Sequence, residues 1–123
     1  MKICQLILFV KDLDQMTRFY RDVLGLVPEA QATESWVPLG AGGCRVVLQP
    51  ISPQIAKDIA IADPPIPRGG AAVKVTFHTD DVESARAHLE GLGAMVRPLR
   101  RFGEVVVFDG VDPEGNVFQV SNR

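Results

Sequence analysis

Apolar and polar residues alternate strictly from residue 73 to residue 78, which predicts a strand with one buried face. The polar face of this strand carries Lys74, Thr76 and His78. Beyond it the apolar residues recur at helical spacing, so we expect a helix that ends at Gly93. Asp80 and Glu83 have the three-residue spacing of a capping box at the start of that helix.

The N-terminal residues 5–26 repeat this strand–helix pattern. The two stretches correspond at three points, if the first helix has one residue more than the second: Gln5 with Lys74, Asp12 with Asp81, and Leu24-Gly25 with Leu92-Gly93. Asp12, with Gln15 three residues later, is the expected cap of the first helix. A strand–helix unit used twice predicts an internally duplicated fold.

Three further strands are expected after each helix. Their predicted ranges are 26–30, 35–39 and 44–49 in the first half, and 94–99, 104–108 and 117–122 in the second, with a turn at 100–103. With residues 3–10 as the first strand, the chain is predicted to be α+β, with two βαβββ modules at about 1–50 and 71–123 in a single domain, 1–123. Residues 50–70 contain five of the nine prolines and form a connector, with one or two helical turns in 54–61. A plain linker and a functional lid or binding loop are both consistent with this composition.

Composition narrows the classes of function. The 123 residues are 46% hydrophobic and 23% charged with a net charge of −2, as in an ordinary soluble domain. Basic residues form no long run, so we expect no nucleic-acid partner, and no apolar stretch is long enough to span a membrane. Cys4 and Cys44 show neither metal-site spacing nor a disulfide framework. We therefore expect a cytoplasmic protein.

Three motifs in register resemble the vicinal oxygen chelate (VOC) superfamily of glyoxalases, bleomycin-resistance proteins and extradiol dioxygenases. They are Phe19-Tyr20-Arg21-Asp22 with Leu24-Gly25-Leu26, Thr79-Asp80-Asp81-Val82, and Asp112-Pro113-Glu114-Gly115-Asn116-Val117-Phe118 before the last strand. The resemblance covers nearly the whole chain. It implies curved mixed sheets that form a cup, with the helices outside. It also implies a homodimer, and leaves open whether the cup closes within one chain or across a dimer.

Metal-dependent members of the superfamily use four cup-facing strand positions as ligands. The resemblance places these positions at Gln5, at either Val47 or Gln49, at Lys74 and at Gln119. A protonated lysine has no acceptor and brings positive charge to the place of the cation, and the amides are weak neutral ligands. We therefore predict that the metal site is lost and expect no cofactor.

A small, anionic or aromatic ligand is the expected occupant of such a cup. The predicted ligand-binding residues are Gln5, Ile7, Phe9, Trp36, Gln49, Lys74, Thr76, His78 and Gln119. Alternatively, Lys74 reaches the rim or pairs with a nearby carboxylate, although the sequence reveals no buried partner. For His78, a solvated surface position is the favoured interpretation.

Two classes of function follow from this interpretation. The favoured one is a metal-free binder that resembles the bleomycin-resistance proteins. The alternative is an enzyme of the superfamily, a lyase, isomerase or dioxygenase, which depends on a metal or uses Lys74 as a base or Schiff-base amine. No catalytic residues are assigned, and a structural partner protein is a third alternative.

Overall fold

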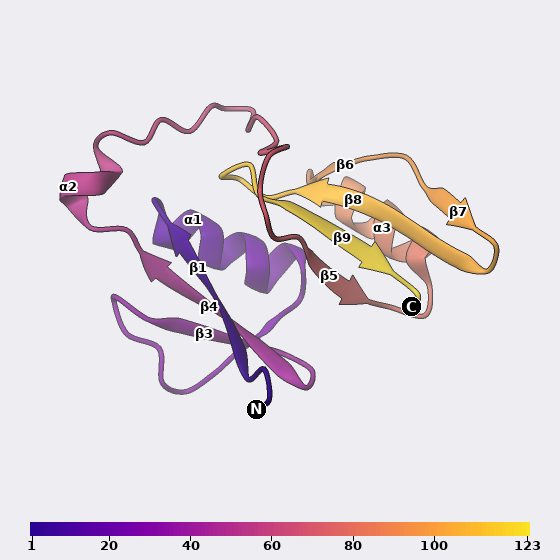
Figure 1. Cartoon of the computed structure of the whole chain (residues 1–123), viewed down its shortest axis with the longest axis horizontal. Coiled ribbons are helices and arrows are strands. Elements are labelled where there is room, and N and C mark those ends of the chain that lie inside the picture. The colour runs from indigo at the N-terminus through magenta and orange to yellow at the C-terminus, as the bar shows by residue number, and fades with distance from the viewer. The chain divides into compact units, whose positions relative to one another are not determined.

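Each half of the chain folds into a mixed sheet with a helix packed on one face (Figure 1). The computed structural model describes all 123 residues, in two units, Met1–Ala60 and Ile61–Arg123. Both sheets are open and curved, and the helix of each unit follows its first strand. The predicted α+β fold with two βαβββ modules is confirmed.

The first unit has a four-stranded sheet in the order β1-β4-β3-β2. Its elements are β1 (Gln5–Val10), α1 (Leu13–Arg18), a π-helical turn η1 (Phe19–Val23), β2 (Val27–Pro28), β3 (Val37–Ala41), β4 (Cys44–Pro50) and the short helix α2 (Pro53–Ala56). β1 pairs with β4 in parallel and is an edge strand. The core of the unit includes Val10, Leu48 and Met16, all fully buried.

The extra residue of the first helix is absorbed by η1. Leu24 N donates to Phe19 O at 3.1 Å, a bond that spans five residues instead of four. A π turn is a one-residue insertion in a helix, and it brings the chain back into step with the second module. Gly25 then ends the helix with a φ of 73°, as Gly93 does in the second unit with a φ of 84°.

The second unit has five strands, with β8 and β9 at the centre of the order β5-β9-β8-β6. Its elements are β5 (Val75–His78), α3 (Val82–Gly91), β6 (Met95–Val96), β7 (Arg100–Phe102), β8 (Val105–Val111) and β9 (Val117–Ser121). β7 pairs with β8, although residues 100–103 were expected to turn. The expected strand 104–108 also runs three residues further, to Val111, because β9 and β6 both pair with that end of it.

The cap of the second helix is Asp81 and not Asp80. Its carboxylate accepts a hydrogen bond from Ser84 N at 2.9 Å, and this backbone donor, together with the Ser84 hydroxyl, lowers the pKa of the Asp81 carboxyl. Asp12 caps α1 in the same way by accepting from Gln15 N at 2.9 Å. The alignment of Asp12 with Asp81 was therefore the correct guide to the second cap, and the capping-box spacing was misleading.

The connector is divided between the two units. In the first, Lys11 Nζ donates to Ile59 O, and the only helix is the single turn α2. In the second, Arg68 N donates to Gly115 O at 2.8 Å and Arg68 Nε to Glu114 O at 3.1 Å. Arg68 thus attaches the end of the connector to the turn that precedes β9. None of the helices has the length and apolar character needed to cross a membrane.

Gly110 provides a sharp test of packing between β8 and β9. A Cβ at this position would lie 2.2 Å from Cζ of Phe118, whose ring packs edge-on against Phe77 with centroids 6.1 Å apart. We expect Gly110→Ala to lower the free energy of unfolding by about 1–3 kcal/mol, because the buried ring must move. Urea unfolding measures this change.

The matched control is Gly91→Ala at the end of α3, where an added Cβ meets nothing within 4 Å. This variant should leave stability unchanged or raise it by up to about 1 kcal/mol, since alanine is the better helix former. Equal effects of the two substitutions would contradict the proposed packing constraint.

Candidate functional site

The carboxylate of Asp109 lies on the face of the second sheet that is opposite α3. Asp109 is near the end of β8 and pairs with Gln119 of β9 across the antiparallel ladder. Its neighbours Phe108 and Gly110 face the helix side, where Gly110 lies under the ring of Phe118. Because side chains alternate along a strand, Asp109 must point the other way, and it is only 8% exposed there.

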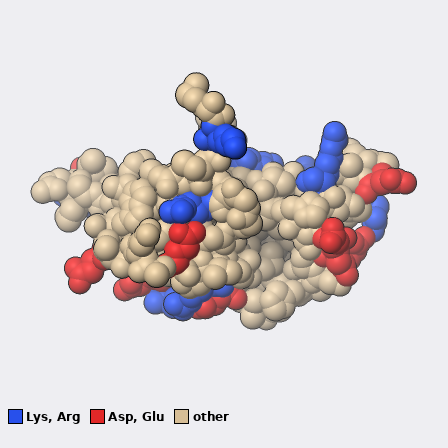
Figure 2. Space-filling view, turned by 90° about the horizontal axis from the view of Figure 1, so that it is seen from below, with Lys and Arg blue, Asp and Glu red and all other residues tan.

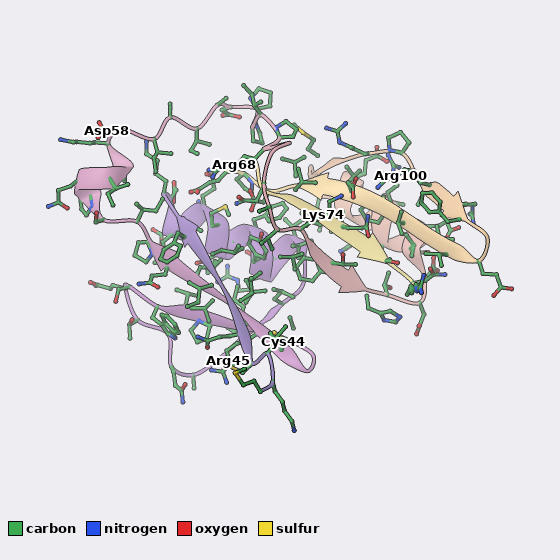
Figure 3. All side chains as sticks on the ribbon, in the orientation of Figure 1. Cys44, Arg45, Asp58, Arg68, Lys74 and Arg100 are labelled. Atoms are coloured by element: carbon green, nitrogen blue, oxygen red, sulfur yellow. The ribbon has the colours of Figure 1, made fainter.

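Three side chains converge on this carboxylate. Lys74 Nζ is 3.2 Å from Oδ1 of Asp109, and Gln119 Nε2 donates to the same oxygen at 3.2 Å. Arg100 contacts the other oxygen, Oδ2, at 2.7 Å. We call Lys74, Arg100, Asp109 and Gln119 the Asp109 cluster. Figure 3 shows Lys74 and Arg100, which come from opposite edges of the sheet, next to β5 and on β7.

The Asp109 cluster carries an excess of positive charge. It has two cations, one carboxylate and one neutral amide, so its formal charge is +1. The side chains of Lys74 and Arg100 are 43% and 48% exposed, whereas that of Asp109 is 12% exposed. An ammonium has three donors and a guanidinium five, and Asp109 accepts one from each. Both cations therefore have donors that Asp109 does not use.

Asp109 and Arg100 were not among the predicted site residues. The expected strand ended at Phe108, so Asp109 lay outside it and no buried carboxylate was expected near Lys74. Lys74 pairs with the carboxylate of Asp109, as one of the two alternatives for this lysine expected. A detectable signal was present, since Asp109 continues the alternation of Val105 and Val107.

Other predicted residues of this unit lie on the same face at different distances from the cluster. Thr76 is the register partner of Gln119 and so flanks the cluster directly. His78 is one step further along, opposite Ser121, and its Nε2 is 3.8 Å from Oδ1 of the exposed Asp80. His78 is therefore a surface residue at the strand end, and the structure does not bring it to Asp109. Phe102, which was not predicted, shares the face of Arg100 on β7 and is 64% exposed.

The remaining predicted residues belong to the first unit. Gln5, Ile7 and Phe9 share one face of β1, and the parallel register places them beside Arg45, Val47 and Gln49 of β4, respectively. Arg45, which was also not predicted, is 3.4 Å from a carboxylate oxygen of Glu29. Trp36 is half-buried and immediately precedes β3, bridged to Thr33.

The strand registers decide which residue of β4 corresponds to Gln119. In the first unit Gln5 pairs with Arg45, and Val47 follows two residues later. In the second, Val75 pairs with Phe118, so Lys74 is in line with Val117, and Gln119 follows two residues later. Val47, which is fully buried, is therefore the equivalent of Gln119 if Gln5 is the equivalent of Lys74. No three His, Cys, Asp or Glu side chains lie together in a way that would hold a metal ion.

Two βαβββ units, with polar residues on the strand faces opposite the helices, define a protein of the vicinal oxygen chelate class. A family model of the glyoxalase-like domain matches residues 5–121, so the chain belongs to the glyoxalase-like domain family. No curated protein matches the chain in a sequence comparison.

Solved structures agree with this assignment. A lactoylglutathione lyase from Agrobacterium tumefaciens is 30% identical, with 98% of this chain and 92% of that chain covered and a TM-score of 0.70. TnmS3, an antibiotic binding protein from Streptomyces sp. CB03234, is 22% identical over 98% and 93% of the two chains, with a TM-score of 0.73. UcmS2 is 17% identical over 100% and 98%, with a TM-score of 0.78. The last two likenesses show the fold alone.

The role of Asp109 as a shared counter-charge predicts the effect of its neutralisation. Asp109→Asn leaves Lys74 and Arg100 without a carboxylate, and we expect the free energy of unfolding to fall by about 1–2 kcal/mol, because both cations are partly solvated. The control is Asp58→Asn, at an exposed position labelled in Figure 3 that forms no ion pair. Urea unfolding at neutral pH should distinguish the two variants, and equal stabilities would contradict this role of Asp109.

Proposed function

We propose that this protein is a metal-free binder of a small organic anion, with the Asp109 cluster as the anion-recognition site. The observation that carries the proposal is the +1 charge of two cations that share one buried carboxylate. A carboxylate, phosphate or phenolate ligand would complete the charge balance through charge-assisted hydrogen bonds to the remaining donors of Lys74 and Arg100.

The chemistry of the ligand is further restricted by its surroundings. Phe102 presents an exposed ring on the same sheet face as Arg100, and its cross-strand neighbour on β8 is the apolar Val105. Ligand sites combine a mostly apolar wall with a few polar groups that fix orientation. An aromatic anion satisfies both parts of this surface, with its charge at the cluster and its ring toward Phe102.

Loss of the metal site is part of the proposal. The four positions that correspond to metal ligands are Gln5, Val47, Lys74 and Gln119. A valine has no donor atom and Lys74 is a cation paired with Asp109, so only two neutral amides remain, which is too few for a divalent cation. TnmS3 shows that this fold can serve an antibiotic binding protein, and we propose a binding role for this chain as well. On the face shown in Figure 2, basic residues form separate small groups, which favours a small ligand over a polyanion.

Titration with benzoate tests the proposal, with the neutral analogue benzamide for comparison. We expect benzoate to bind more tightly than benzamide. Lys74→Met keeps the apolar stem but removes a charge-assisted hydrogen bond of about 1.5–3 kcal/mol, so benzoate affinity should fall roughly ten- to a hundredfold. The salt dependence of binding should flatten as well. Calorimetry measures the affinity, and thermal unfolding of the same samples monitors the fold.

The charge-matched control is Lys57→Met, because Lys57 is exposed just after α2 and lies in the other unit. It should bind benzoate as the parent protein does. Lys74→Met should still fold, since Arg100 and Gln119 continue to satisfy Asp109. Unchanged benzoate binding by Lys74→Met, or equal binding of benzoate and benzamide by the parent protein, would refute the anion site.

An enzyme is the second candidate function, favoured by the 30% identity to a lactoylglutathione lyase. Metal-dependent catalysis requires a divalent cation, and a metal-free alternative requires Lys74 to leave its ion pair with Asp109 and act as an amine. We expect no stoichiometric, tight binding of Zn²⁺, Ni²⁺ or Mn²⁺ to untagged protein in metal analysis and titration. Tight binding of any of them would favour the metal-dependent enzyme and overturn the binder.

A further inference from the structure

The two cysteines of the chain lie side by side at the starts of two paired strands. Gln5 is the register partner of Arg45, and Arg45 N donates to Cys4 O at 3.3 Å, which extends the parallel pairing back to Cys4. Cys44 is the first residue of β4. Cys4 and Cys44 are therefore opposite each other, one step before the first pair of the ladder. The two cysteines are 40 residues apart in the sequence, so their proximity could not be predicted from their spacing.

Their side chains also share a face. Neighbouring residues of a strand point to opposite faces, and register partners point to the same one. Gln5 and Arg45 face one way, so Cys4 and Cys44 both face the other. Paired strands are about 4.8 Å apart, within the range of about 4.4–6.8 Å over which a disulfide joins two Cα atoms.

Both residues are free thiols of different accessibility. Cys4 is exposed and Cys44 is half-buried, with its Sγ 3.6 Å from the carbonyl oxygen of Arg45. An accessible thiol with a second thiol close by is the arrangement in which an oxidised sulfur is resolved to a disulfide before it is oxidised further.

We propose that Cys4 and Cys44 form a peroxide-sensitive dithiol. In the first step the Cys4 sulfur attacks a hydroperoxide, the O–O bond breaks, and a sulfenic acid forms with release of an alcohol or water. In the second step the Cys44 thiol attacks the sulfenic sulfur, an S–S bond forms and water is released. Two thiols are thereby oxidised by two electrons, and one hydroperoxide is reduced.

The bridge would act on an edge strand. β1 pairs with β4 alone, and it carries Gln5, Ile7 and Phe9 on the face opposite the thiols. A covalent link at the start of β1 would hold this strand against β4 and close the chain between them. Oxidation should therefore raise the melting temperature of the protein, by up to about 15 °C on the chain entropy expected for a loop of this length.

Hydrogen peroxide is the probe for the experiment, applied to the full chain in native buffer. We expect non-reducing peptide mass spectrometry to find a peptide linking Cys4 to Cys44, with loss of both free thiols and a higher melting temperature. Dithiothreitol should reverse all three changes. Conversion of either cysteine to sulfinic or sulfonic acid without the cross-link, or a cross-link only between chains, would overturn the proposal.

A register control separates specific pairing from the mere presence of two thiols. In the double variant Cys4→Ser, Gln5→Cys the first thiol moves by one residue and points to the opposite face. We expect its cross-link to Cys44 to form at least about tenfold more slowly than in the parent protein. Equal rates would show that the pairing does not depend on the strand register, and would overturn the inference.

Discussion

Two neighbouring residues of strand β8 have different requirements on the two faces of the second sheet. Gly110 must lack a side chain, because the ring of Phe118 occupies the space above it on the helix side. Asp109, one residue earlier, must point to the opposite face, where its carboxylate is nearly buried and needs counter-charges. β8 pairs with β6, β7 and β9, so a change in which face either residue points to would disturb the pairing of three other strands.

The buried carboxylate of Asp109 changes what Lys74 can do at a position that corresponds to a metal ligand of the superfamily. An isolated Lys74 would be a mobile charge at the rim, whereas Asp109 holds it beside Gln119 and opposite Arg100. Two cations held by one carboxylate retain a net positive charge and donors that the carboxylate does not use. In the function that we propose, the arrangement that disfavours a divalent cation is also the one that favours an anion.

The two modules preserve the elements that set the backbone and differ in the residues that carry chemistry. Asp12 and Asp81 cap equivalent helices, and Gly25 and Gly93 end them, while η1 absorbs the single insertion. On the strand faces, in contrast, Val47 stands where the second module has Gln119. Helix caps and helix-ending glycines are fixed by local backbone geometry, which few residue types satisfy. Positions on a strand face accept a wider range of side chains.

The sequence by itself determined the duplicated βαβββ fold, because hydrophobic periodicity, caps and turns are local properties of the chain. It also placed Lys74 and Thr76 on one face of their strand, since side-chain alternation follows from strand geometry alone. Gln119 was placed with them only through the resemblance to the superfamily. The tertiary structure decided which charges meet. Lys74, Arg100 and Asp109 are on three strands or strand ends, and only the pairing of those strands brings their atoms within bonding distance. The neighbourhood of Cys4 and Cys44 has the same origin, because register between distant strands is fixed by packing and not by the residues at either end.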